Sequence, residues 1–145
     1  MNISLLSKSV KDTIAVGAKL GKTLHRGDVV ALYGELGAGK THLAKGIAKG
    51  LSVKDLVRSP SFVIMNVYKG TVPVYHFDFY RLKDARQLEN LAFFEYLNGD
   101  GVCVIEWADR VADSLPRGCI RVFMRAGKGD TRTIRISGVK KAVFR

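Results

Sequence analysis

The stretch VVALYGELGAGKT, residues 29–41, decides the fold of this chain. Its last eight residues match the phosphate-loop pattern G-x-x-x-x-G-K-[ST] at every fixed position. The five apolar residues before the loop are typical of a strand buried on both faces of a parallel sheet. Residues 40–51 are patterned as a helix that ends near Gly50. This motif requires a preceding strand and a following helix, so the context predicts a nucleotide site rather than a chance match.

The chemistry of the loop depends on its glycines and on the two residues that open the helix. Gly34, Gly37 and Gly39 allow backbone conformations closed to other residues, which turn N–H groups inward toward an anion. The start of the helix adds the positive end of its dipole. Lys40 supplies an ammonium for the β- and γ-phosphate oxygens, and the Thr41 hydroxyl is placed to ligate Mg²⁺. We therefore expect a nucleoside triphosphate with magnesium.

Two acidic residues follow apolar runs elsewhere in the chain. Glu106 ends the run 102–105, like the acid that ends a Walker-B strand, and Asp78 follows the run 74–77. Ligands of open α/β sheets gather at the carboxyl ends of the strands. Either carboxylate alone is equally consistent with a helix cap or a solvated side chain. Two such positions beside a phosphate loop favour a functional pair.

Two other features allow two interpretations each. His76 favours a packed strand residue when it is considered alone. The stretch Arg58-Ser59-Pro60-Ser61 lies where many phosphate-loop proteins sense the γ-phosphate, but an ordinary turn set by Pro60 explains it equally well.

The rest of the chain alternates predicted strands and helices. Ser9 is a suitable N-cap for a helix. Further elements are expected at residues 62–68 and 72–77 (a strand hairpin), 82–97 (a helix), 102–107 (a buried strand), and 119–124 and 131–136 (two outer strands). This alternation indicates an α/β fold. We expect a single P-loop NTPase domain over residues 1–145, with a mixed, mainly parallel sheet flanked by helices and including antiparallel strands.

Length and composition restrict the class of protein. At 145 residues the chain fits one domain. No apolar stretch reaches the roughly 18 residues that span a bilayer, and lysines interrupt the first 25 residues, so we expect neither a membrane segment nor a secretory signal. Cys103 and Cys119 sit in apolar runs, which favours two buried thiols in a reducing cytoplasm over a disulfide.

The positive charge is concentrated near the end of the chain. The net charge is +11, and residues 117–145 hold nine basic residues and one acidic residue, a net +8. Such a segment is suited to RNA or to an acidic protein surface. A solvated face on a nucleotide-binding protein is the alternative interpretation.

Missing motifs exclude some nucleotide-binding classes. The chain has neither N-K-x-D nor D-x-x-G, which argues against a guanine-specific switch GTPase. No separate arginine-rich lid segment follows the loop, which argues more weakly against a metabolite kinase.

Five segments together resemble the TsaE family, also called YjeE. They are GELGAGKT at 34–41, RSPSF at 58–62, HFDFYRL at 76–82, LE at 88–89 and IEW at 105–107. The resemblance runs from about residue 10 to 136, and the spacing of its last elements is far more specific than the loop alone. Members are small bacterial ATPases required for threonylcarbamoyladenosine at position 37 of tRNAs that read codons starting with A.

The resemblance implies roles for particular residues. Gly37, Ala38, Gly39, Lys40, Thr41 and His42 would bind ATP, Thr41 and Glu106 would contact Mg²⁺, and Lys40, Asp78 and Glu106 would serve hydrolysis. Thr13 and Arg132 are the nearest matches to family positions that contact the base. Trp107 would lie in a mobile segment, and residues 59–62 would act as a switch. His42 and Ser61 stand where family members usually have Thr, and both substitutions keep polar character.

The resemblance also implies a partner. Members bind the complex of TsaB and TsaD, and ATP turnover resets that complex between rounds of tRNA modification. We expect a slow, partner-stimulated cytoplasmic ATPase. For its basic segment, contact with tRNA held by the partner and a solvated face are both left open. A nucleotide-gated protein-binding module with incidental hydrolysis and a small-molecule kinase are the alternatives.

Overall fold

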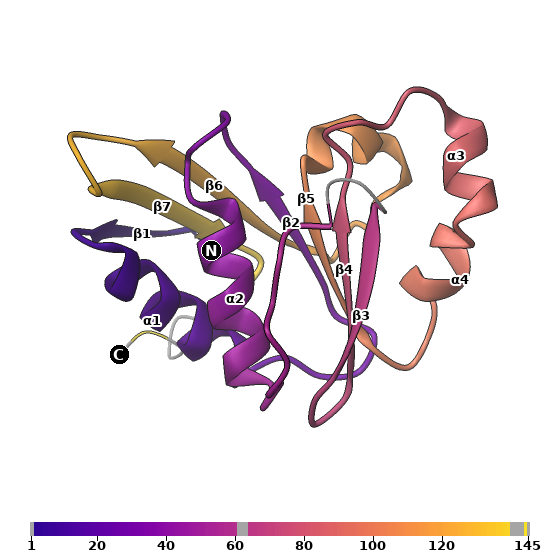
Figure 1. Cartoon of the computed structure of the whole chain (residues 1–145), viewed down its shortest axis with the longest axis horizontal. Helices are drawn as coiled ribbons and strands as arrows, with labels where there is room; N and C mark the ends of the chain where they lie inside the picture. Colours follow the sequence, from indigo (N-terminus) through magenta and orange to yellow (C-terminus); the bar gives the residue numbers. More distant parts are fainter. Residues whose placement is uncertain (1, 61–63, 140–143, 145) are drawn as a thin grey trace.

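The computed structural model describes residues 2–60, 64–139 and 144, which form a seven-stranded sheet with helices on both faces (Figure 1). The strand order is β1-β7-β6-β2-β5-β4-β3. The strands are β1 (Asn2–Ser7), β2 (Val29–Tyr33), β3 (Met65–Lys69), β4 (Pro73–Asp78), β5 (Val102–Glu106), β6 (Ile120–Ala126) and β7 (Arg132–Ser137). The helices are α1 (Val10–Gly21), α2 (Lys40–Gly50), α3 (Ala85–Asn90), α4 (Phe93–Leu97) and the 3₁₀ helix η1 (Ala108–Ser114).

The centre of the sheet is parallel, as the apolar runs predict. β2 pairs in parallel with both β5 and β6, and β5 pairs in parallel with β4. The pairings β3–β4, β6–β7 and β1–β7 are antiparallel, so β3 and β7 run against the other five strands. This confirms the mixed, mainly parallel sheet and the hairpin. The first strand of the hairpin, β3, begins at Met65, whereas residue 62 was predicted. Residues 61–63 lie outside the described part of the chain.

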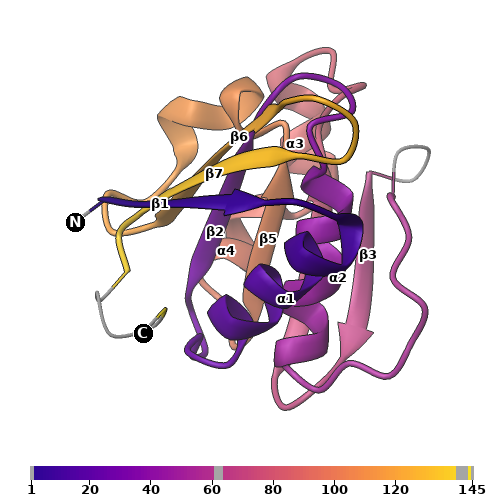
Figure 2. The same cartoon turned by 90° about the vertical axis from the view of Figure 1, so that its left-hand side faces the viewer.

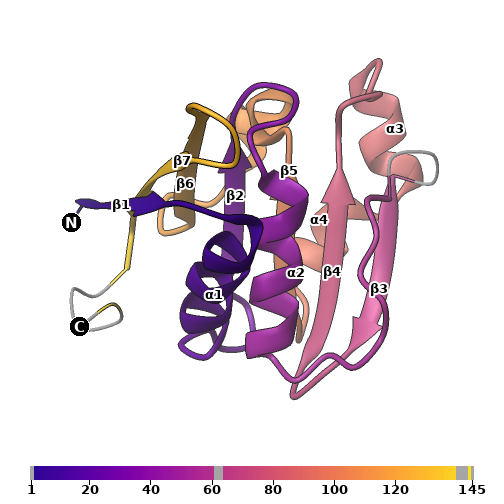
Figure 3. The ribbon, with the colours of Figure 1, turned by 60° about the vertical axis from the view of Figure 1, so that its left-hand side comes forward.

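α1 and α2 pack side by side on one face of the sheet (Figure 3). Ser9 caps α1 as expected, and its side chain accepts a hydrogen bond from the Asp12 N–H. Glycines disfavour a helix interior, but here they let the two backbones touch. A Cβ at Gly17 or Gly46 would overlap backbone atoms of the opposite helix. Close contact between the two helices therefore explains these glycines, which by their helix propensity alone would destabilise a helix.

The opposite face is covered by α3, α4 and η1 over β4, β5 and β2. Phe77, Phe79 and Phe93 form a buried aromatic cluster there. The prediction of a single helix over residues 82–97 was wrong, because the segment forms two short helices. α3 ends at Asn90, and Ala92 adopts a left-handed conformation with φ 55° before α4 begins. The break lets the two short helices pack separately on the sheet. Asp84 caps the first of them, and its side chain accepts a hydrogen bond from the Arg86 N–H.

The two strands predicted to be outer strands are not at the edge. β6 lies directly beside β2, and β1 closes the sheet beyond β7 (Figure 2). β1 alternates exposed and partly buried residues, and so weak a pattern did not predict a strand. Its position depends on antiparallel pairing with the far end of the chain, where Leu5 is opposite Ile134.

Both cysteines are buried and free, which confirms two thiols rather than a disulfide. Burial raises the pKa of Cys103 to about 12. Among the described residues, no helix is long and apolar enough to cross a membrane.

Candidate nucleotide-binding site

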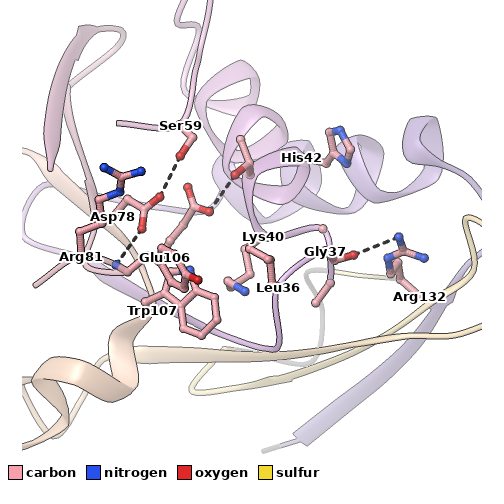
Figure 4. Close-up of a pocket in the computed structure, with 14 residues that line it drawn as sticks. Leu36, Gly37, Lys40, His42, Ser59, Asp78, Arg81, Glu106, Trp107 and Arg132 are labelled. Carbon is pink, nitrogen blue, oxygen red and sulfur yellow. Dashed lines mark hydrogen bonds between the residues drawn. The ribbon is translucent and has the colours of Figure 1, made fainter. Parts of the chain in front are cut away.

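The phosphate loop joins β2 to α2, and a cavity of about 440 Å³ opens beside it. β4 and β5 end at the same cavity, because they run parallel to β2. Its lining residues are Leu36, Gly37, Ala38, Gly39, Lys40, Thr41, His42, Ser59, Asp78, Tyr80, Arg81, Glu106, Trp107 and Arg132 (Figure 4). The fold thus brings together residues from five separate parts of the chain.

The loop has the backbone geometry that its glycines predict. Gly37 has φ 81° and Gly39 has φ 98°, both in the left-handed region that favours glycine. Gly39 is also the N-cap of α2, and no side chain caps that helix end. The first N–H groups of α2 therefore have no side-chain acceptor in the described structure, as an anion-binding helix start requires.

Lys40 is buried at the centre of the site. Its ammonium donates hydrogen bonds to the carbonyl oxygens of Gly34 and Glu35, the latter at 2.9 Å. It also lies 4.1 Å from the centre of the Trp107 ring. Burial lowers the pKa of Lys40, while the carboxylates of Glu106 and Asp78 act in the opposite direction. Phosphate oxygens would have to take the place of the loop carbonyls as partners of this ammonium.

The two carboxylates lie side by side at the ends of β4 and β5, where Asp78 is opposite Glu106. The Thr41 hydroxyl donates to Glu106 Oε1 at 2.8 Å. The Ser59 hydroxyl donates to Asp78 Oδ2 at 2.8 Å, and the Tyr80 N–H donates to Asp78 Oδ1 at 3.0 Å (Figure 4). The predicted grouping of both carboxylates with the phosphate loop is therefore confirmed, while their chemical roles stay predictions.

The oxygen atoms at this point fit a magnesium ion. Mg²⁺ prefers hard oxygen ligands and usually binds through one or two carboxylates together with phosphates and water. The Thr41 hydroxyl and the Glu106 carboxylate already touch, so both can reach one ion. Their arrangement suits a metal brought with a nucleotide.

Comparison with known proteins identifies the family. Residues 7–134 match the family model described as threonylcarbamoyl adenosine biosynthesis protein TsaE. The chain belongs to the TsaE family. A TsaE protein of Treponema pallidum is 39% identical over 132 residues, 91% of this chain and 98% of that protein. The TsaE protein of Bacillus subtilis is 38% identical over 130 residues, 89% of this chain and 81% of that protein.

A solved structure supports the same assignment. The crystal structure of Bacillus subtilis YdiB matches this TsaE-family chain with a TM-score of 0.81 and 31% sequence identity. The match covers 99% of this chain and 90% of YdiB. The similarity therefore includes the whole sheet and the phosphate loop, in agreement with the fold expected from the sequence.

The two residues expected near the base of the nucleotide lie in different places in this TsaE-family chain. Arg132 lines the cavity and its Nη2 donates to the Gly37 carbonyl at 3.1 Å. Thr13 is buried, its hydroxyl lies 2.7 Å from that of Ser7, and it is not among the residues that line the cavity. His42 lines the cavity as well. The contact between Thr13 and the base therefore stays a prediction, and Thr13 does not line this cavity.

Sequence reasoning missed the part that His76 plays in this site. His76 Nε2 lies 2.6 Å from Glu106 Oε2, and both side chains are buried. Its Nδ1 has no hydrogen-bond partner among the described residues. His76 therefore holds one oxygen of Glu106 while Thr41 contacts the other. The signal was its spacing: on a strand, residues two apart share a face, so His76 points to the same side as Asp78.

Backbone strain marks the residue after Glu106. Trp107 has φ 57°, a left-handed conformation that is uncommon for a residue other than glycine. Its ring packs against Tyr80 with ring centres 4.9 Å apart and lines the cavity. Strained backbone is often kept at functional sites. Of the predicted switch stretch, Ser59 contacts Asp78, whereas residues 61 and 62 lie outside the described part of the chain.

Proposed function

We propose that this chain is a magnesium-dependent ATPase that serves threonylcarbamoyladenosine modification of tRNA. The observation that carries the proposal is the contact between Thr41 of the phosphate loop and Glu106 at the end of β5, with Asp78 beside it. A mere anion pocket does not need two carboxylates next to a triphosphate site. A metal-assisted transfer of the γ-phosphoryl group does.

Each residue would act through its own contacts. The N–H groups of residues 37–41 and the Lys40 ammonium would hold the β- and γ-phosphates. Bound magnesium, held by Thr41 and Glu106, would neutralise charge on the phosphate oxygens. Asp78 would accept a hydrogen bond from the attacking water and orient it. Ser59, which already donates to Asp78, links that carboxylate to the stretch that we propose senses the γ-phosphate.

The family relationship supports the pathway and the partner. The relatives from Treponema pallidum and Bacillus subtilis are named tRNA threonylcarbamoyladenosine biosynthesis proteins. We propose that the chain acts in the cytoplasm, binds the TsaB–TsaD complex and resets it by hydrolysis. Phosphate-loop proteins that receive an arginine from a partner gain roughly 10³ to 10⁵ in rate. Turnover by the isolated chain should therefore be slow and rise when the complex is added.

The sole tryptophan provides the direct test. Because Trp107 lies against Lys40 and lines the cavity, its fluorescence should change on addition of Mg·ATP and change again with the TsaB–TsaD complex. Phosphate release should increase in the same samples. An unchanged fluorescence signal together with no nucleotide binding by calorimetry would exclude the proposal.

The same experiment separates the alternatives. Binding of Mg·ATP without any stimulated phosphate release would indicate a nucleotide-gated binding module. Transfer of the γ-phosphate to a metabolite from a cell extract, rather than to water, would indicate a kinase.

A further inference from the structure

One face of the sheet carries a row of arginines and aromatic rings that the nucleotide site does not use. α1 and α2 cover β6 and β7 on one side, while α3 and α4 lie at the opposite end of the sheet from β1 and β7 (Figure 1). The strands alternate accordingly: Val122 and Met124 are buried, whereas Phe123 and Arg125 are exposed. We call Tyr33, Arg121, Phe123, Arg125 and Arg135 the arginine face.

Its planar groups are aligned across three neighbouring strands. Tyr33 on β2 is opposite Phe123 on β6, which is opposite Arg135 on β7. The two rings stack with centres 4.7 Å apart and planes 12° apart. The Arg135 guanidinium lies 5.2 Å from the centre of the Phe123 ring. Three flat side chains thus form a row. The Phe123 side chain in its middle is still 37% exposed, so it is accessible to a ligand.

The strands of this face carry charge of one sign, and the acidic residues near it, Glu35 of the phosphate loop and Asp109 of η1, lie at its edge on the side of Tyr33. β1, β2, β6 and β7 contain no Asp or Glu, so no acidic residue of these strands neutralises the arginines. A hollow of about 590 Å³ lies on the face, lined by Tyr33, Phe123, Arg125 and Arg135 and bordered by Glu35 of the phosphate loop. Arg132, in contrast, points to the other side and contacts Gly37.

We propose that the arginine face binds a single-stranded segment of RNA. Proteins that bind unpaired nucleotides combine cations that track the backbone with aromatic side chains on which bases stack. An acidic protein surface would match the charge, but it has no need for stacked rings. The hydroxyls of Ser4 and Thr133 also line the hollow and suit sugar or phosphate oxygens. The proposal rests on the proposed function for the choice of RNA, because a role in tRNA modification places RNA within reach.

The test uses the full chain and a fluorescein-labelled, unstructured RNA of twelve nucleotides. Binding is measured by fluorescence anisotropy over a series of salt concentrations. The double variant Arg125→Gln/Arg135→Gln should weaken binding at least about tenfold and reduce the slope of log K against log salt by about 1.4, since each phosphate contact contributes about 0.7. Phe123→Leu keeps an apolar side chain but removes the stacking surface, and should weaken binding about fivefold or more.

The matched control is Lys11→Gln/Lys19→Gln, which removes the same charge from exposed positions of α1, away from the arginine face. It should change the RNA affinity less than twofold. An equal loss in this control would show nonspecific attraction and overturn the proposal. The absence of RNA binding at 50 mM salt would also overturn the proposal. A polyglutamate peptide that binds as tightly as the RNA, and whose binding is weakened equally by the arginine-face variants, would overturn it as well.

Crosslinking supplies a readout that needs no variant. RNA containing 4-thiouridine should crosslink to Tyr33 or Phe123 of the unmodified chain, as mapped by mass spectrometry. Crosslinks confined to other surfaces would overturn the proposal. The Trp107 response to Mg·ATP is recorded in the same samples, so failure of RNA binding is distinguishable from failure of the nucleotide site.

Discussion

The two halves of the sheet differ in how many of their faces are covered. β2, β5 and β4 contribute buried side chains to the core on both faces of the sheet, and every residue of β5 is buried. β6, β7 and β1 have helices on one side and leave the arginine face open. In the covered half, the polar side chains of the site lie at or close to the strand ends, where Asp78 and Glu106 meet the phosphate loop. In the open half, polar side chains can spread along the strands.

The halves meet at β2 and at the start of the phosphate loop. Gly34 and Glu35 border the hollow on the arginine face, and their carbonyl oxygens accept hydrogen bonds from Lys40. A Cβ at Gly34 would also approach the Met124 carbonyl of β6 at 2.6 Å. If the two halves have separate functions, substitutions in one half should leave the readout of the other intact.

The largest effect is expected from Lys40→Ala. This change should weaken Mg·ATP binding about 1,000-fold, within the range for truncating one partner of a buried charged pair. Isothermal titration calorimetry measures the loss, and Lys49→Ala, on an exposed position of the same helix, is the control. RNA affinity should remain within twofold of the unmodified chain. A parallel loss of RNA binding would show that the two halves are not separate.

Glu106→Gln should lower turnover roughly 100-fold, the upper end of the range for changes around a bound metal. Nucleotide affinity should fall much less, because the loop N–H groups and Lys40 remain. Steady-state phosphate release at saturating Mg·ATP measures the effect. Glu95→Gln, exposed on α4, should have normal turnover. Unchanged magnesium-dependent turnover in Glu106→Gln would rule out its metal role.

Gly46→Ala tests the helix layer that covers one face of both halves. The added Cβ would overlap the Ile14 carbonyl and Gly17 Cα, so the helices must separate. We expect the free energy of unfolding to fall by about 2–3 kcal/mol, as for other overpacked interiors. Chemical denaturation measures this change. Gly118→Ala, where a Cβ would meet nothing within 4 Å, should be nearly neutral.

His76→Leu should have the smallest of these effects. Loss of the hydrogen bond to Glu106 would leave that carboxylate less well oriented and raise the magnesium concentration for half-maximal turnover about tenfold. His76→Gln, which can still donate a hydrogen bond, should restore part of the loss. His25→Leu, at an exposed position, is the control. A drop in stability with an unchanged magnesium dependence would show that His76 only packs.

Local sequence patterns predicted the central elements well. The strand at 29–33 and the helix that begins at Lys40 have the bounds expected, because the apolar run, the glycines and the loop motif all agree. Prediction failed where the structure of a segment depends on packing against residues far away in the sequence. Residues 82–97 have helical spacing throughout, yet packing on the sheet breaks them at Ala92. β1 has too weak a pattern to be recognised without β7.

The sequence by itself determined the phosphate loop, the strand before it, the helix after it and the two acidic strand ends, because these depend on local conformation and on periodicity. Only the tertiary structure decided that His76 holds Glu106, that Arg132 and Arg135 point to opposite sides, and that glycines in α1 and α2 serve close contact. Those features depend on strand order and register. Register joins residues that are distant in the chain. Local periodicity shows which side chains of a strand share a face, but not which strand lies beside it or which residue lies opposite.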